Sequence, residues 1–352
     1  MRVERYPHNP IITPADVTPH HADFEVIAAF NAGVAVLGDE TILLLRVAER
    51  PHSPNPQFIY APIFAAKDRQ LQMKKFDLSD VTYDYRDPRV ISLSGHKDTF
   101  EFLTSLSYFR VARSKDGYNF TVDTEPFMYP ESEFESFGIE DARVTKIENT
   151  FYITYSMVSP MGIGVGLAST TDFRTVQRHG MVLAPENKDG VLFPETIDGK
   201  YYALHRPVPK SNGQPEVWIA ESLDLIHWGQ HQPLFGLRPN SWDSDRIGAG
   251  FSPIATPAGW LELYHGADKN SRYCMGAILL DKANPRKVLS RTKGPILEPT
   301  QSYEVNGFFG NVVFGCGAVV HGDGVQMYYG VADTSMACCT LSLSDIMAEL
   351  HS

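Results

Sequence analysis

The stretch AGVAVLGDETILLLRVAE (residues 32–49) contains two short apolar runs joined by a tight turn. Runs of this length that are rich in Val, Ile and Leu and bounded by turn residues are typical of a β-hairpin. The same pattern returns four more times, at residues 142–158, 194–208, 252–268 and 317–333. A supersecondary unit that recurs in this way indicates a repeat architecture.

A second pattern follows each hairpin: a strand that ends in Ser or Asp, a polar turn, and a short further strand. It occurs at residues 112–120, 168–176, 220–228, 278–288 and 341–347, and its aspartates are spaced 52 to 64 residues apart. Together the two patterns predict five units of four strands, and hence an all-β, five-bladed β-propeller with a central substrate funnel. The alternative is a β-sandwich with coincidental hairpins.

Residues 50–100 fit neither pattern. We predict that they form an insertion, a lid or rim loop over one mouth of the funnel, within a single propeller domain that spans residues 1–352. The segment DIMAEL near residue 350 predicts a short helix, and the N-terminal residues are expected to close the ring beside the last blade.

Bulk composition excludes several classes of protein. The 352 residues are 43% hydrophobic and 21% charged, with a net charge of −11 that disfavours nucleic acid as a partner. The N-terminus lacks the apolar run of a secretory signal, and no stretch is apolar enough to span a membrane as a helix. Because no secretory signal is expected, we predict a cytoplasmic location. The four cysteines lack zinc spacing and two are adjacent, so we expect buried, reduced thiols.

Polar residues gather where the second strand of each hairpin ends. In a propeller these positions converge on the central axis, although any single one could be a satisfied core group or a solvated turn charge. The set consists of Arg46, Tyr155 with Ser156, His205 with Arg206, Tyr264 with His265, and Tyr329 with Asp333.

The pair Glu140 and Asp141 precedes a strand that should enter this channel. Glycoside hydrolysis usually needs two carboxylates, whereas attack by phosphate needs one proton donor and cations that hold the anion. Four basic groups at blade ends could supply that charge, namely Lys188, Arg206, Arg246 and His265, although each alone could be a surface charge. The Gly-rich segment RIGAG (residues 246–250) would let the backbone approach an anion closely.

Two other features suggest no chemistry. The segment Asp87-Pro88-Arg89 lies in the insertion and is interpreted as a structural turn. His8, His20 and His21 have no metal-ligand spacing with a supporting carboxylate or thiol, so no metal is expected.

Seven segments resemble glycoside hydrolase family 130, over nearly the whole chain from about residue 9 to 347. They are FGIEDARV, ENKDGVLFPE, GKYYALHRP, RIGAG, GWLELYHGA, FFGNVVF and YYGVADT. Within the family the chain is most similar to the phosphorylases of β-1,2-mannobiose and β-1,2-oligomannan. The resemblance implies a five-bladed propeller and an inverting, metal-independent reaction without cofactor, in which inorganic phosphate and a β-mannoside give α-mannose 1-phosphate.

The resemblance also implies roles for individual residues. Asp141 matches the general acid, whose proton passes through the 3-hydroxyl of the mannosyl unit. Phosphate-binding positions are matched by Lys188, Arg206, Arg246, His265 and Tyr273. Substrate-binding positions are matched by Asn31, Arg46 and Asp333, and we assign Glu140 to the same group. Arg246 stands where many members of the family have Lys, and Lys188 stands where others have Arg. Both differences keep the positive charge but change the geometry of the side chain.

Three rival functions stay open. A β-1,2-mannosidase on the same fold would use water, with Glu195 or another carboxylate as base. A phosphorylase of β-1,4-linked mannosyl-glucose or manno-oligosaccharides would differ in its acceptor, which depends on the insertion and on residues 303–309. A non-catalytic sugar-binding propeller would need no Asp141. A homo-oligomer, in which a neighbouring subunit completes the acceptor subsite, is also possible.

Overall fold

The computed structural model describes residues 2–96 and 100–351, and strands dominate it. Five antiparallel sheets account for most of the chain, numbered here in chain order. Their strands are β2 (Phe24–Leu37), β3 (Glu40–Pro51), β9 (Leu106–Ser114) and β10 (Thr121–Val122) in sheet 1; β11 (Ile139–Ile147), β12 (Thr150–Ser159), β13 (Gly162–Thr170) and β14 (Gln177–Leu183) in sheet 2; β15 (Asn187–Leu192), β16 (Tyr201–Pro207), β17 (Val217–Ser222) and β18 (Trp228–Phe235) in sheet 3; β19 (Arg246–Ala249), β20 (Ile254–Thr256), β21 (Gly259–Ala267), β22 (Tyr273–Leu280) and β23 (Val288–Arg291) in sheet 4; and β24 (Val313–His321), β25 (Gly324–Val331), β26 (Ser335–Ser342) and β1 (Val3–Arg5) in sheet 5.

The predicted hairpins are confirmed in sheets 1, 2 and 5, where residues 32–49, 142–158 and 317–333 span the two paired first strands. In sheet 4, residues 252–268 form the hairpin of β20 and β21, and in sheet 3, residues 194–208 contain the second strand β16 but not its partner β15. The turns between third and fourth strands are also alike in sheets 1 to 4. In each, an aspartate carboxylate accepts hydrogen bonds from the backbone N–H groups two and three residues further on; these aspartates are Asp116, Asp172, Asp224 and Asp281. This turn chemistry explains the aspartate spacing in the sequence.

Neighbouring sheets pack face to face through apolar residues. One buried cluster lies between each consecutive pair of sheets, and another joins sheet 5 back to sheet 1. Each cluster can be represented by one residue from each of its two sheets. From the interface of sheets 1 and 2 round to that of sheets 5 and 1, the pairs are Phe109 and Ile153, Leu167 and Leu192, Val191 and Ile247, Leu263 and Met327, and Tyr328 and Leu43. The sheets therefore form a closed cycle of neighbours. Their first strands follow it, since β24 contacts β2, β2 contacts β11, β11 contacts β15 and β15 contacts β19.

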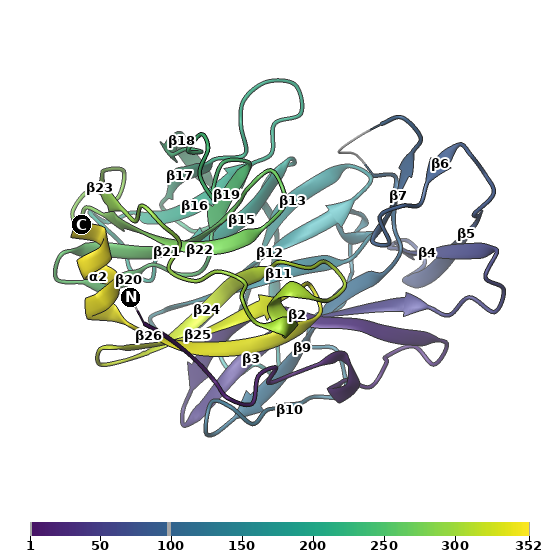
Figure 1. Cartoon of the computed structure of the whole chain (residues 1–352), viewed down its shortest axis with the longest axis horizontal. Coiled ribbons are helices and arrows are strands. Elements are labelled where there is room, and N and C mark those ends of the chain that lie inside the picture. Colours follow the sequence, from purple (N-terminus) through teal and green to yellow (C-terminus); the bar gives the residue numbers. More distant parts are fainter. Residues whose placement is uncertain (1, 97–99, 352) are drawn as a thin grey trace.

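The predicted insertion lies outside the five sheets, between the end of β3 and the start of β9. It is more regular than a rim loop, with a hairpin of β4 (Phe58–Ala65) and β5 (Gln70–Asp77) beside a small sheet of β6 (Tyr83–Asp84), β7 (Val90–Leu93) and β8 (Phe102–Leu103). Its residues 97–99 lie outside the described part of the chain. Ala61, Phe76 and Ile91 form its own small core. Figure 1 shows it projecting to one side of the sheets.

The two ends of the chain meet at sheet 5. As predicted, the N-terminal strand β1 completes this sheet by pairing with β26, and residues 343–351 form helix α2 (Leu343–His351). Figure 1 shows both ends on the same side of the molecule. The remaining elements are α1 (Ser302–Val305) and two 3-10 turns, Pro14–Asp16 and Glu133–Glu135.

Two further expectations can be compared with the structure. The four cysteines are free and buried, as predicted. Over residues 2–96 and 100–351, no helix is long and apolar enough to cross a membrane.

Candidate functional site

The first strands of sheets 1, 2 and 3 share one backbone irregularity. The pairing register shifts after Phe30 in β2, after Glu140 in β11 and after Lys188 in β15. The next residue in each strand has a positive φ: 45° at Asn31, 52° at Asp141 and 53° at Asp189. Asn and Asp tolerate this conformation better than other side chains, and such a bulge re-aims a side chain out of the regular alternation. We call these the Asn31, Asp141 and Asp189 bulges.

The Asn31 and Asp141 bulges meet through hydrogen bonds to one carboxylate. Asn31 Nδ2 and Arg46 Nη1 each donate to Oδ1 of Asp141 at 2.9 Å. Arg46 Nη2 also donates to Oε1 of Glu140 at 2.8 Å, and its guanidinium lies over the ring of Phe30, 4.6 Å from the centroid. Four of the predicted substrate and catalytic residues therefore form one connected group.

Electrostatics within this group favour the ionised form of Asp141. Burial alone would raise the pKa of Asp141, but the charges of Arg46, Arg143 and Lys188 and the Asn31 hydrogen bond outweigh it and lower the pKa. The pKa of Arg46 is raised, because Glu140 and Asp141 offset the burial of its charge. Without a ligand, Asp141 is therefore a carboxylate held by cations.

A second group surrounds the Asp189 bulge. Oδ2 of Asp189 lies 2.9 Å from Nε of Arg206 and 3.3 Å from Nε2 of His265, and Oδ1 lies 3.8 Å from Nη2 of Arg143. The pKa of Asp189 is strongly lowered: its burial is outweighed by the charges of Arg206, His265 and Arg143. The pKa of His265 is lowered too, because burial dominates over its contact with Asp189.

Two side chains join the groups. Lys188 sits opposite Arg206 in the strand register, and its Nζ lies 3.7 Å from Oε2 of Glu140. Arg143, which is only 1% exposed, donates from Nη1 to the backbone carbonyl of Asp141 at 2.8 Å while its Nη2 faces Asp189. The carboxylate of Asp141 and the cations around Asp189 are thus parts of one buried polar network.

Arg246 and Tyr273 lie at the outer end of this network. Nη1 of Arg246 donates to the hydroxyl of Tyr273 at 3.4 Å, and its Nη2 pairs with Asp245 at 2.7 Å. The ring of Tyr273 is 6.3 Å from that of His265, centroid to centroid. Arg246 is 41% exposed, far more than Arg206 at 10%, so it is the more accessible of the two cations.

Asp333 receives a contact from the insertion. Nη1 of Arg89 lies 3.6 Å from Oδ2 of Asp333, and the guanidinium stacks over the ring of Phe309, 3.9 Å from the centroid. Burial raises the pKa of Asp333 to about 6, against the lowering charges of Arg46 and Arg89. Asp333 is thus placed between the network and the insertion.

The structure brings all ten predicted site residues into this region. Three of the tyrosines at strand ends point elsewhere: their hydroxyls bond to Glu135, Asp243 and Glu304 between or beside the sheets; these are Tyr155, Tyr264 and Tyr329. Glu195, the suggested base for a hydrolase, is instead a surface residue with 60% exposure that pairs with Lys282.

Three residues of the network were missed from the sequence: Arg89, Arg143 and Asp189. Phe309 belongs to the segment 303–309 that was expected to influence the acceptor. Asp87-Pro88-Arg89 does form a turn, since the Asp87 carboxylate accepts the N–H of Arg89, but the Arg89 side chain also reaches the site. Asp189 could have been found by aligning the first strands of sheets 2 and 3, where Glu-Asp-Ala and Lys-Asp-Gly occupy the same place.

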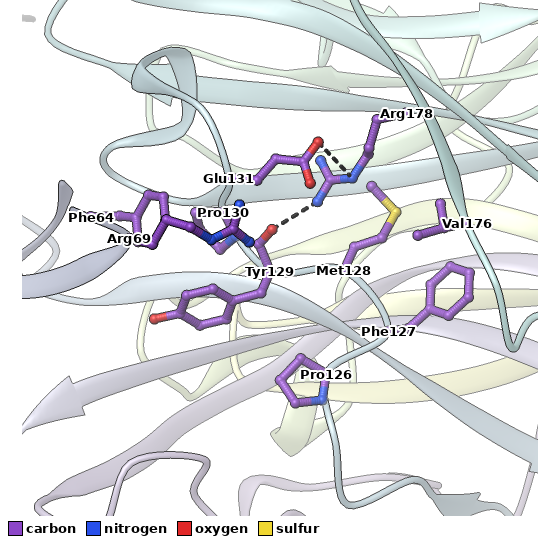
Figure 2. A pocket seen from close by; sticks show the side chains of 10 residues that line it. All are labelled: Phe64, Arg69, Pro126, Phe127, Met128, Tyr129, Pro130, Glu131, Val176 and Arg178. Carbon is purple, nitrogen blue, oxygen red and sulfur yellow. Dashed lines mark hydrogen bonds and ion pairs between the residues drawn. The ribbon is translucent and has the colours of Figure 1, made fainter. Parts of the chain in front are cut away.

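A separate pocket of about 300 Å³ lies near the insertion hairpin, lined by Phe64, Arg69, Pro126, Phe127, Met128, Tyr129, Pro130, Glu131, Val176 and Arg178. Figure 2 shows Arg178 held there by the backbone carbonyl of Tyr129 and by the Glu131 carboxylate. None of the ten predicted site residues lines it, so this pocket is not part of the network.

Comparison with known proteins gives an independent assignment. The family 130 pattern, described as β-1,4-mannooligosaccharide phosphorylase, matches residues 96–351. The chain belongs to glycoside hydrolase family 130. It is 54% identical to a β-1,2-mannobiose phosphorylase of Listeria innocua serovar 6a, over 100% of this chain and 99% of the other. This family member is therefore a glycoside phosphorylase, as the sequence resemblance predicted.

Two further relatives set the range of the family. A 1,2-β-oligomannan phosphorylase of a Thermoanaerobacter species is 41% identical over 73% of this chain and 85% of its own length. The solved structure of the Listeria innocua enzyme, described as a β-1,2-mannobiose complex, superposes with a TM-score of 0.98 over 100% of this chain and 99% of that one. A family 130 structure described in a report on hydrolases of β-1,2 mannosidic linkages, 21% identical with a TM-score of 0.74 over 97% of this chain and 94% of that one, shares the fold.

Proposed function

We propose that the protein is an inverting phosphorylase of β-1,2-linked mannobiose or short β-1,2-oligomannans. The observation that carries the proposal is the continuity of the buried network, which links one candidate acid, Asp141, to the cations Lys188 and Arg206 and to His265. An oxyanion nucleophile needs such cations, and it needs no second carboxylate as base.

We propose further that the five sheets are the blades of a single-domain β-propeller. Support comes from the closed cycle of clusters between sheets and from the ring closure by β1. The bulges at Asn31, Asp141 and Asp189 occupy equivalent places in three successive first strands. In a propeller those strands surround the central axis, which would gather the three side chains at one funnel.

In the proposed reaction a phosphate oxygen attacks the anomeric carbon of the terminal mannosyl unit, and the β-glycosidic bond breaks on the opposite face. The products are α-mannose 1-phosphate and the shortened acceptor. The proton that the leaving oxygen needs comes from Asp141, relayed by the 3-hydroxyl of the mannosyl unit as in the resembling family. Asn31, Arg46, Glu140 and Asp333 hold this sugar unit.

Phosphate also helps to prepare the acid. Asp141 has a lowered pKa when only cations surround it. An anion that binds Lys188, Arg206 and His265 offsets part of that positive charge and so raises the pKa of the nearby carboxyl group. In this mechanism Arg246 and Tyr273, at the outer end, complete the phosphate subsite.

The structure gives less support to the hydrolase than to the phosphorylase, because neither Glu195 nor Asp189 is suited to act as its base. Glu195 lies at the surface beside Lys282, and Asp189 is neutralised by two cations and a histidine, which makes it a weak base. A β-1,4-mannooligosaccharide phosphorylase is the second candidate, because that is how the matching family pattern is described. The rim contacts of Arg89 and Phe309 belong to the region on which the acceptor linkage depends.

The test is product analysis. Incubation with β-1,2-mannobiose should release α-mannose 1-phosphate in the presence of phosphate and no sugar product in its absence. The reverse reaction, with α-mannose 1-phosphate and a panel of acceptors, should release phosphate and form a β-1,2 linkage. Mannose release that does not depend on phosphate would establish the mannosidase, and a β-1,4 product would establish the second candidate.

We also propose a cytoplasmic location, where the four free thiols stay reduced and phosphate is abundant. The insertion is proposed as a lid over the acceptor side of the funnel, on the evidence of the Arg89 contact. The homo-oligomer stays a prediction.

A further inference from the structure

Asp189 is a buried carboxylate inside the proposed phosphate subsite. Its side chain is 4% exposed, and its oxygens face Arg206, His265 and Arg143 at 2.9, 3.3 and 3.8 Å. A negative charge at this place is unexpected, since it occupies the surroundings that an incoming anion would use. The proposed mechanism so far gives it no task.

The backbone around Asp189 is built to hold that carboxylate. The residue adopts a φ of 53° at its bulge, which turns the side chain toward sheet 4. Gly248 provides the space there: a β-carbon at this position would lie 2.1 Å from Oδ2 of Asp189 and 2.5 Å from Nε2 of His265. Any larger residue than glycine at position 248 would displace both groups.

Two opposite effects follow from the charge of Asp189. Buried cations without a counter-charge are costly, so the carboxylate stabilises the empty subsite and fixes the directions of Arg206 and His265. The same negative charge repels phosphate. At a separation of about 5 Å, even an effective dielectric constant of about 20 makes that repulsion worth more than tenfold in affinity.

We propose that Asp189 is a positioning residue that keeps the phosphate-binding side chains oriented before phosphate enters, and that it does so at the expense of phosphate affinity. Arg206 and His265 then meet each phosphate ion already in place, which lowers the reorganisation needed in the reaction. This inference rests on the proposed phosphorylase function.

The variant Asp189→Asn keeps the shape of the side chain and removes its charge. We expect the KM for phosphate to fall at least about tenfold, because the repulsion is lost. We expect kcat to fall about ten- to a hundredfold, because Arg206 and His265 lose their fixed orientation. The KM for mannobiose should stay unchanged. Glu195→Gln, which removes the same charge from an exposed position, is the matched control and should leave all three constants unchanged.

Thermal unfolding with and without phosphate gives a second measurement. Phosphate should raise the Tm of Asp189→Asn more than that of the wild type, since the ion replaces the missing counter-charge. A KM for phosphate that is unchanged or raised would overturn the proposal, as would an unchanged kcat. A variant that folds neither with nor without phosphate would overturn it too, because phosphate then cannot substitute for the carboxylate.

The wild type separates this inference from the proposed function. If the wild type forms sugar phosphate only when phosphate is present, the function stands, and the variant tests Asp189 alone. If wild-type product formation ignores phosphate, the proposed function fails before the variant is considered.

Discussion

The bulges at Asp141 and Asp189 have the same backbone and different surroundings. Each aspartate follows a register shift in the first strand of its sheet, with φ values of 52° and 53°. Asp141 accepts from Asn31 and Arg46 and is 15% exposed, whereas Asp189 is 4% exposed among Arg206, His265 and Arg143. The repeat supplies two equivalent carboxylates, and the neighbouring sheets decide which of them can reach a substrate.

The comparison shows that the same β-bulge can present an aspartate for two different roles. At Asp141 the two side chains that donate hydrogen bonds to the carboxylate come from sheet 1, and the side chain keeps 15% exposure. At Asp189 the neighbouring side chains come from sheets 2, 3 and 4 and enclose it. We therefore assign proton transfer to the first aspartate and charge balance to the second, and four experiments can break or sharpen this division.

The largest effect is expected from Asp141→Asn. The amide cannot donate an acidic proton, so kcat for phosphorolysis should fall by about two to four powers of ten. Since phosphate and the Asp141 charge oppose each other, the KM for phosphate should fall as well, but less than in Asp189→Asn, whose carboxylate lies against Arg206. Steady-state kinetics with both substrates varied checks this, and a fully active Asp141→Asn enzyme would overturn the assignment of Asp141 as the proton donor.

A smaller effect is expected from Arg206→Gln on the other side of the comparison. Loss of one charged donor should raise the KM for phosphate about ten- to a hundredfold, with the KM for mannobiose unchanged. The same substitution removes a cation that lowers the pKa of Asp189, so that pKa should rise. Equal changes in both KM values would instead indicate general damage to the site.

Arg89→Gln tests the link between the insertion and the sugar side. Asp333 loses a partner 3.6 Å away, so we expect the KM for mannobiose to rise about three- to tenfold while the KM for phosphate stays the same. Arg86→Gln is the matched control, because Arg86 lies in the same insertion with an 88% exposed side chain that pairs with Asp84. If both variants behave alike, the insertion acts only through its stability.

The smallest effect concerns stability and Asp333. Its pKa is raised to about 6, above the ordinary value of 3.8, so the folded protein binds a proton more tightly than the unfolded chain. The resulting stabilisation is present below pH 3.8 and is lost as the pH rises through 6. In Asp333→Asn the free energy of unfolding should therefore fall less between pH 4 and pH 7 than in the wild type, by up to about 2 kcal/mol. Denaturant unfolding curves at a series of pH values measure this. Parallel curves for variant and wild type would contradict the assignment.

The sequence predicted the repeat well because its signals are local. Apolar alternation marks the hairpins, and the aspartates at residues 116, 172, 224 and 281 satisfy nearby N–H groups, so neither feature depends on distant parts of the chain. Arg46 and Asp141 could be singled out for the same reason, since each stands at a fixed place in its repeat.

The missed residues depend on tertiary placement. Arg89 reaches Asp333 only because the insertion folds back toward a strand end more than two hundred residues away, and no local pattern encodes that contact. Arg143 looked like a strand residue beside the acid pair, yet it is the cation that connects both aspartates. The tyrosines at strand ends were misjudged because successive side chains of a strand point to opposite faces, so the neighbour of a site residue can face the space between sheets.

The pairing of β1 with β26 has a consequence for biosynthesis. Val3 is the partner of Leu341, and Arg5 forms an ion pair with Glu304. During translation the first strand must wait, unpaired, until nearly all later residues have left the ribosome. An antibody that binds residues 3–5, or a protease that cleaves there, would therefore distinguish nascent chains from completed molecules. Loss of its access would report the moment at which β1 pairs with β26.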